Sequence, residues 1–332
     1  MISRRDFART LTAGGASALI GIRSHPARAE PSPESKRIRL IHRPSLCEAP
    51  NYVAEELLHG EGFTEVQYIK REEGPAADAL ASGDADISMI FGPPIILRID
   101  AGDPLVFLSG VHIGCAQVVA TERVRTIAEL KGKKVAITAL RDTFHLFIAS
   151  AAAHVGLKPD TDINWVTPTF ADWPRLLAEG KIDAFLAGPP AVQELRAKKI
   201  GHVLVDFLTD RPWSQYYCCM VVAHRDFVRR HPVAAKRALR AILKASNLCA
   251  LEPDKVARFL VEKGHVERSD YAIQAMREIV YGKWREYDPA DTVRFYSLRL
   301  HEAGLVKSSP QKILAQGTDW RFLNELKKEL KG

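Results

Sequence analysis

Two copies of one short phrase, LASGDADISMIFGPP at 80–94 and LAEGKIDAFLAGPP at 177–190, stand in the two halves of this chain of 332 residues. In each copy a helix ends at a glycine, an apolar run of strand length follows an aspartate, and Gly-Pro-Pro ends that strand. Because proline fits the first turn of a helix, each Gly-Pro-Pro predicts the start of another helix. The sequence therefore predicts a duplicated βα unit. Two such units facing each other would form one crevice of the kind where open α/β sheets bind ligands.

The segments that flank the two copies alternate between strand and helix patterns. The second half repeats the order of the first, and 118–120 and 216–223 are expected to carry the chain to the second half and back. Beyond Pro232 the pattern changes to amphipathic helices, which we expect to cover the first lobe. The other expected strands lie at 38–41, 66–69, 87–91 and 105–109 in the first half and at 134–138, 163–166, 182–186 and 203–206 in the second.

The N-terminus carries the pattern of an export signal. Arg4-Arg5 is followed by a mildly apolar stretch at 10–22 and by Ala27-Arg28-Ala29, a small-residue cleavage site. We therefore predict a twin-arginine signal that is cleaved after Ala29, and a periplasmic protein. The alternative interpretation is an amphipathic surface helix that contains two arginines. No later run reaches the roughly 20 apolar residues that a membrane span needs.

The predicted signal holds most of the chain's formal charge of +7, because five arginines stand there against one aspartate. About +3 is left for the rest of the chain. Basic clusters such as 131–134 lack the interleaved aromatic side chains on which bases could stack. We interpret them as solvated faces and expect no nucleic-acid partner.

The cysteines are five in number and form no CxxC pair, so they cannot all be paired in an oxidising compartment. Cys218 and Cys219 are adjacent in an expected strand, where their side chains should face opposite sides. Such a scattered set is typical of buried, small apolar side chains, and the alternative is a metal or redox site. We find no tight set of histidine and cysteine and expect no metal and no cofactor. The full set is Cys47, Cys115, Cys218, Cys219 and Cys249.

Short motifs spread over nearly all of the expected mature chain carry a resemblance: IRL at 38–40, AP at 49–50, ASGDAD at 81–86, ELKGKKVA at 129–136, FV at 227–228 and HPV at 231–233. With these motifs the chain resembles the periplasmic substrate-binding proteins of the nitrate, sulfonate, taurine and thiamine-precursor ABC importers. The most specific motif is LKGKKV. The resemblance implies a type II periplasmic binding fold, in which two α/β lobes are joined by two crossover strands, here with a helical C-terminal tail.

The resemblance also divides the chain and implies its partners. We expect a monomer that binds a small-molecule ligand and docks on an ABC permease/ATPase complex. The expected parts are the signal at 1–29, a disordered lead-in at 30–36, the first part of lobe one at 37–115, lobe two at 116–220, and the return to lobe one with the C-terminal helices at 221–332.

In this family the ligand pocket is formed by the turn after the first strand, the turns after the repeat strands, and the loop before lobe two's first helix. Helix N-termini present unpaired N–H groups and partial positive charge, so several around one cleft suit an anionic or strongly polar ligand. No catalytic residue is expected. Carried over by position, and joined by His112 and Tyr216 near the crossings, the expected ligand-binding residues are Arg43, Pro44, Ser45, Gly92, Pro93, His112, Leu140, Arg141, Asp142, Thr143, Gly188, Pro189 and Tyr216.

Each of these residue types also has a plainer interpretation. Arg43 and Arg141 occupy matching loops, where a guanidinium could bind a carboxylate or sulfonate with two parallel bonds or could simply face solvent. Asp142 and Thr143 could be helix caps. His112 could be a hinge histidine without a ligand, and Tyr216 could fill the core between the lobes.

We interpret the chain as a non-enzymatic solute-binding component whose lobes close on a ligand, and we predict that Arg141→Ala weakens binding. One alternative is a thiamine-pyrimidine synthase-like enzyme on the same fold, in which Cys218, Cys219 and histidines would have to bind iron. Another is a ligand-presenting subunit of a periplasmic sensor. No motif favours a sulfonate, nitrate, a carboxylate or a pyrimidine as the solute.

Overall fold

The computed structural model describes residues 30–43, 45–70, 76–266 and 269–330. The predicted twin-arginine signal at 1–29 lies outside the described residues. The predicted lead-in begins the described part, and its Glu34 carboxylate accepts hydrogen bonds from the backbone N–H groups of Val233 and Ala234, at 3.1 and 2.9 Å. Within the described part, none of the helices is both long and apolar enough to cross a bilayer.

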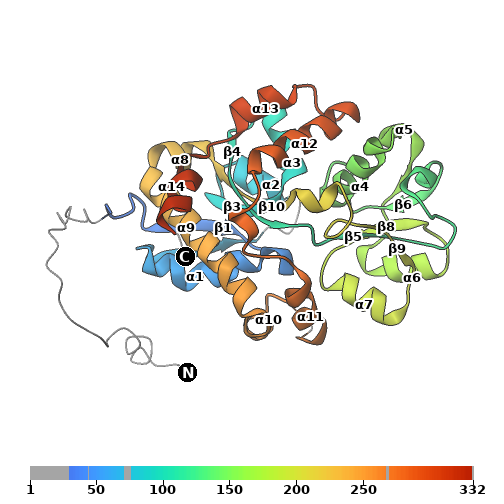
Figure 1. The fold of residues 1–332 in the computed structure, drawn as a ribbon, viewed down its shortest axis with the longest axis horizontal. Helices are drawn as coiled ribbons and strands as arrows, with labels where there is room; N and C mark the ends of the chain where they lie inside the picture. The colour runs from blue at the N-terminus through green and yellow to red at the C-terminus, as the bar shows by residue number, and fades with distance from the viewer. Residues whose placement is uncertain (1–29, 44, 71–75, 267–268, 331–332) are drawn as a thin grey trace, which may run out of the picture. The chain divides into compact units, whose positions relative to one another are not determined.

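Two sets of strands organise residues 32–332, and they share one strand order (Figure 1). The second lobe has a five-stranded sheet in the order β7-β6-β8-β5-β9. In the first lobe β2 pairs with β1, and β3-β10-β4 forms a sheet beside them. Each lobe contains one strand that runs antiparallel to its neighbours and that directly follows a passage between the lobes. This strand is β10 in the first lobe and β5 in the second. The strands are β1 (Arg37–Ile41), β2 (Glu65–Ile69), β3 (Ile87–Phe91), β4 (Leu105–Ile113), β5 (Gln117–Ala120), β6 (Lys134–Ala136), β7 (Asn164–Val166), β8 (Ala184–Ala187), β9 (His202–Asp206) and β10 (Tyr217–His224).

The repeated aspartate has the same structural role in both lobes. Asp86, just before β3, accepts a hydrogen bond from the Arg39 N–H (2.9 Å), donates its own N–H to the Arg39 carbonyl (2.9 Å) and pairs with the Arg39 guanidinium (2.6 Å). Asp183, just before β8, accepts from the Lys134 N–H (2.9 Å), donates to the Lys134 carbonyl (2.8 Å) and pairs with Arg123 (3.0 Å). Hydrogen bonds to an ionised carboxylate are among the stronger ones, so each aspartate fastens two strands together.

Helices follow the strands as the sequence predicts. Both Gly-Pro-Pro turns lead directly into a helix, α3 in the first lobe and α7 in the second. Short 3-10 turns are η1 (Leu46–Glu48), η2 (Ile127–Leu130), η3 (Phe170–Asp172), η4 (Trp213–Gln215) and η5 (Lys283–Arg285). The helices are α1 (Ala49–Gly60), α2 (Ala76–Ala81), α3 (Gly92–Asp100), α4 (Thr143–His154), α5 (Pro159–Asp162), α6 (Trp173–Ala178), α7 (Ala191–Lys198), α8 (Arg225–Arg230), α9 (Pro232–Leu251), α10 (Pro253–Glu262), α11 (Ser269–Glu278), α12 (Pro289–Glu302), α13 (Pro310–Gly317) and α14 (Arg321–Glu329).

The chain passes between the lobes twice, from β4 to β5 and from β9 to β10. The two passages touch at Gly114, where an added Cβ would lie 1.9 Å from the carbonyl oxygen of Phe207. Backbone cannot give way to a methyl group at that distance, so the close approach requires glycine. This contact holds the two connections against each other at the point where the lobes meet.

The C-terminal helices contact both lobes, whereas the sequence predicted that they cover the first. Helix α12 packs on α3 of the first lobe and on α4 of the second. Helix α11 lies beside α7 (Figure 1), and its Glu278 accepts hydrogen bonds from Gln193 (2.8 Å) and Arg196 (3.0 Å) of the second lobe. Helical periodicity shows that a helix has an apolar face but not which neighbour covers it.

Candidate functional site

A cavity of about 430 Å³ lies between the lobes, at the carboxyl ends of β3 and β8. The first lobe contributes the loop after β1 together with η1, and the second lobe contributes α4, α6 and the turn from β8 to α7. The connection from β4 to β5 reaches its wall through Cys115 and Ala116, and the start of β10 reaches it through Cys218 and Cys219. Helices α1, α4 and α7 all begin at the cavity, so their N-termini bring N–H groups and partial positive charge to it.

Arg43 and Glu48 form an ion pair at the first-lobe side of the cavity, with 2.9 Å between Arg43 Nη1 and Glu48 Oε1. Of the described residues that line the cavity, only these two belong to the charged residue types. The Tyr52 hydroxyl fixes the arginine, since it accepts from the Arg43 N–H (2.8 Å) and donates to the Arg43 carbonyl (2.5 Å). The Glu48 side chain is 2% exposed, and its Oε2 has no hydrogen-bond partner within the described part of the chain.

The electrostatics of this pair follow from its burial. Burial raises the pKa of Glu48 to about 7, and the neighbouring charge of Arg43 limits the rise. Arginine stays protonated in proteins. The pair therefore presents a ligand with the guanidinium donors of Arg43, whereas the unpaired Oε2 of Glu48 is buried below the cavity surface.

Aromatic side chains form most of the remaining wall. In the second lobe Phe144 meets Trp173 edge to face at 5.3 Å between ring centroids, and Phe170 meets the same tryptophan at 4.8 Å. Between the lobes Phe91 of β3 stacks on Phe147 of α4, with centroids 3.5 Å apart and planes 6° from parallel. Such walls suit an apolar, flat group, and they confine strong polar recognition to the Arg43–Glu48 side.

The structure brings five of the predicted ligand-binding residues to this cavity: Arg43, Ser45, Thr143, Gly188 and Pro189. They come from both lobes, as the carry-over by position implies. Pro44 lies outside the described residues. Whether these side chains bind a ligand stays a prediction, but their common location agrees with one.

The other predicted residues do not line the cavity. Gly92 and Pro93 are buried in the first turn of α3, directly after the cavity residue Phe91. Leu140 is 64% exposed and Arg141 is exposed, with a positive φ of 68°. That these positions bind a ligand stays a prediction.

Three of the plainer interpretations match the structure. Asp142 caps α4 by accepting the His145 N–H at 2.8 Å. Tyr216 stacks on Phe295 of α12, with ring centroids 4.0 Å apart, and so fills space between elements. His112 is fully buried, with Nδ1 2.7 Å from the Ile113 carbonyl and Nε2 3.0 Å from the Cys47 carbonyl.

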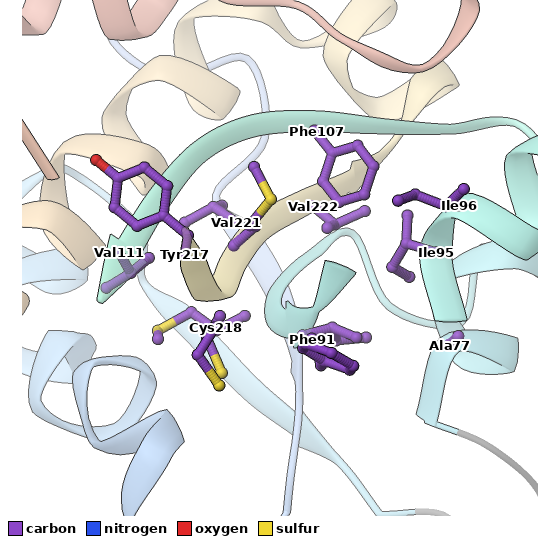
Figure 2. Packing of buried hydrophobic residues seen from close by; sticks show 14 of the residues in the cluster. Ala77, Phe91, Ile95, Ile96, Phe107, Val111, Tyr217, Cys218, Val221 and Val222 are labelled. Carbon is purple, nitrogen blue, oxygen red and sulfur yellow. The ribbon is translucent and has the colours of Figure 1, made fainter. Parts of the chain in front are cut away.

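The interpretation of the cysteines as buried side chains is confirmed for Cys218, Cys219 and Cys249, but the expectation that histidine and cysteine form no tight set is wrong. Cys47, Cys115, Cys218 and Cys219 all line the cavity, and the ligand atoms of Cys47, His112 and Cys115 lie within 4.8 Å of one another. Cys218 and Cys219 were expected to face apart, but the pairing of β10 with β4 is irregular on both sides of Cys219. A β-bulge of this kind re-aims a side chain, which explains how both thiols reach the cavity. Figure 2 shows Cys218 projecting away from Tyr217, toward the side on which Phe91 lies.

Sequence reasoning missed Glu48 and the aromatic wall. The last expected ligand-binding residue of this loop was Ser45, three residues before Glu48. A signal was present, because Phe144 and Phe147 are three residues apart at the start of the helix that was expected to face the pocket, a spacing that places them on one face.

Comparisons with known proteins agree with this architecture. The nitrate-binding protein NrtA of Synechocystis superposes with a TM-score of 0.72 at 17% identity, over 91% of this chain and 90% of that one. The alkanesulfonate-binding protein SsuA of Xanthomonas axonopodis, solved with MOPS, gives 0.65 at 16%, over 84% and 96%. The sulphonate-binding SsuA of Escherichia coli gives 0.65 at 19%, over 83% and 91%.

At these identities the likeness establishes the fold, which is the predicted α/β periplasmic binding fold with two lobes and a helical C-terminal region. No curated protein sequence matches the chain. The sequence model of one family, described as NMT1-like, matches residues 32–261, more than half of the chain. The chain belongs to the NMT1-like family.

Proposed function

We propose that this protein is the solute-binding component of an ABC importer, which captures a small organic molecule between its lobes and delivers it to a membrane permease without altering it. One observation carries the proposal: residues of both lobes and of the connection from β4 to β5 wall a single cavity. A ligand there contacts both lobes, so its binding energy favours the closed arrangement. The nitrate-binding and sulfonate-binding proteins named above support this class of function.

The proposed solute has an apolar, flat body and one polar or anionic group. The six aromatic rings around the cavity favour the body, and the Arg43 guanidinium and the helix N-termini favour the anionic group. This combination describes an aromatic or alicyclic carboxylate or sulfonate better than a bare inorganic anion, which would leave most of the wall without a contact. The proposed binding residues are Arg43, Ser45, Glu48, Thr143, Phe147, Trp173, Gly188 and Pro189.

The remaining expectations belong to the same proposal. Export by the twin-arginine route with cleavage after Ala29, a periplasmic location, and a monomer that docks on a permease/ATPase complex are the arrangement that a solute-binding component needs. We also propose the lobe boundaries at 37–115, 116–220 and 221–332; the position of β5 supports the first of them, whereas β10 begins at Tyr217 and favours a return to the first lobe a few residues before 221.

The thiamine-pyrimidine synthase-like alternative loses two of the arguments against it, because Cys218 and Cys219 share the cavity wall and a histidine lies beside the cysteines. Both nitrogens of that histidine, however, face backbone carbonyl oxygens. Each carbonyl oxygen occupies the place where an iron ion bound to that nitrogen would have to lie, so in this arrangement His112 is not positioned to bind iron. Binding without chemistry therefore remains the proposal.

A thermal-shift screen of the purified protein tests the proposal with nitrate, alkanesulfonates, aromatic and aliphatic carboxylates, and pyrimidines. A ligand that binds only the folded state stabilises it by about 2.7 kcal/mol at a hundred times its Kd, so an aromatic carboxylate or sulfonate is expected to raise the Tm. Arg43→Met should abolish the shift, whereas Arg229→Met, on exposed α8, should retain it. Turnover of any of these compounds, or no shift with any of them, contradicts the proposal.

One prediction concerns the contact between α11 and α7. Glu278→Ala removes the hydrogen bonds from Gln193 and Arg196 that tie the tail to the second lobe. Because such partly exposed pairs contribute about 0.5–1 kcal/mol, the ligand-free equilibrium should shift roughly two- to fivefold toward an open arrangement. Small-angle X-ray scattering should record a larger radius of gyration. Glu286→Ala, which breaks a pair inside one short segment, is the matched control, and an equal effect of both variants would contradict the prediction.

A further inference from the structure

The cysteine cluster at the cavity is built from three distant parts of the chain. Cys47 lies on η1, Cys115 on the connection from β4 to β5, and Cys218 on β10. The Sγ of Cys115 lies 2.7 Å from the Sγ of Cys47 and 3.4 Å from the Sγ of Cys218. Cys249 shows the contrast, because it is fully buried in an apolar cluster of α1, α9, α10 and α11 and away from the cavity. Packing explains Cys249 but not three sulfurs gathered at a cavity wall.

Buried side chains fix the backbone that carries Cys47. The His112 Nε2 lies 3.0 Å from the Cys47 carbonyl oxygen, and the Tyr281 hydroxyl donates to the carbonyl of Leu46. His112 and Tyr281 are themselves in edge-to-face contact, 5.2 Å between centroids, and both are buried. Two successive carbonyl groups are thus held from the interior. The backbone that carries the Cys47 thiol is therefore held in place beside the cavity.

We propose that the sulfurs of Cys47, Cys115 and Cys218 bind a soft d10 metal ion at the wall of the cavity. Thiolates select soft or borderline cations such as Cu⁺, Zn²⁺ and Cd²⁺ over hard ones. Metal–sulfur bonds of about 2.3 Å place two sulfurs of a tetrahedral site about 3.8 Å apart. Cys115 and Cys218 are already close to that separation. Cys47 has to turn away by about 1 Å, and its half-buried side chain on a short 3-10 turn has room to do so.

The position of the proposed ion links it to the cavity. The same three cysteines line the cavity with Glu48 and Arg43, so one side of the ion faces the space between the lobes. Three protein ligands leave a coordination position open, as in metal sites that also bind a solute. The ion would join η1, β10 and the connection from β4 to β5, since its three ligands come from those segments.

Titration of the purified, reduced and metal-free protein with Cd²⁺, without oxygen and with a non-thiol reductant, tests the proposal. One Cd²⁺ per chain is expected, with a thiolate-to-metal charge-transfer band in the ultraviolet and with stoichiometry confirmed by equilibrium dialysis and elemental analysis. Cys47→Ser, Cys115→Ser and Cys218→Ser should each weaken binding roughly 100-fold or more, because the loss of an outer-shell partner alone weakens metal sites 10- to 100-fold. Cys249→Ser is the matched control and should bind as the wild type does.

A footprint on the wild-type protein keeps the test independent of how the variants fold. Bound Cd²⁺ should protect Cys47, Cys115 and Cys218 from iodoacetamide, as read by peptide mass spectrometry. The proposal is overturned if the reduced protein binds no Cd²⁺ at one per chain, if binding survives all three substitutions, or if the three thiols alkylate equally with and without the ion. A Cys47–Cys115 disulfide in the isolated protein, combined with no metal binding after reduction, overturns it as well. No solute enters this experiment, so its outcome is separate from that of the proposed transport function.

Discussion

The wild-type protein is expected to become less stable as pH rises, and Glu48→Gln is expected to abolish this pH dependence. The folded-state pKa of Glu48 is about 7, above the ordinary value of 4.5, because the carboxyl group is buried. Between these two values the folded protein keeps a proton that the unfolded chain releases, so the free energy of unfolding falls as pH rises through this window. The contribution is about 2 to 3 kcal/mol between pH 5 and pH 8.

Urea unfolding at pH 5, 6, 7 and 8 measures this effect. Wild type and variant should differ in the slope of their free energy of unfolding against pH, while glutamine keeps the shape of the side chain. Glu286→Gln changes an exposed carboxylate and should retain the wild-type slope. If the free energies of unfolding of wild type and Glu48→Gln changed in parallel with pH, Glu48 would have the same pKa in the folded and the unfolded protein. That result would contradict the prediction.

Phe147→Ala is the second change with a large expected effect. This ring is 3% exposed, stacks on Phe91 of the first lobe and meets Phe207 edge to face at 4.7 Å. Removal of a buried phenylalanine leaves a hole that its neighbours fill incompletely, which costs about 3–5 kcal/mol. The free energy of unfolding should fall by this amount, and the Tm shift caused by a bound solute should shrink because one face of the cavity is lost.

Two controls separate these effects. Leu251→Ala removes a side chain that is 77% exposed and should change stability by less than about 0.5 kcal/mol. Phe147→Leu keeps most of the apolar volume and should lie between alanine and the wild type. If Phe147→Ala unfolded at the wild-type urea concentration, the stacked contact between the lobes would not contribute to stability.

The fold could be predicted from the sequence because its signals are local and repeated. The two Gly-Pro-Pro turns, the strand-length apolar runs before them and the glycines at helix ends each specify backbone conformation within a few residues. The structure places β3 at Ile87–Phe91 and α2 at Ala76–Ala81, as expected. The two crossing strands could also be predicted, because each is an apolar run that lies outside the duplicated βα units.

The site was harder to predict because it depends on where individual side chains point. Arg43 and Arg141 occupy matching loops, yet one is paired with a buried glutamate at the cavity and the other faces solvent. A positional argument treats them alike. Similarly, alternation along a strand sends Cys218 and Cys219 to opposite faces, and only the irregular pairing with β4 reverses this. That irregularity depends on a partner strand about a hundred residues away in sequence.

The paired aspartates have a consequence for how this scaffold can diversify. Asp86 and Asp183 fasten the strands at their amino ends, whereas the cavity is formed at the carboxyl ends of the same strands. The hydrogen bonds that join the strands and the loops that would contact a solute thus lie at opposite edges of each sheet. Loops could be exchanged to recognise a different molecule, in nature or in a designed biosensor, while the hydrogen bonds of Asp86 and Asp183 between the strands are retained.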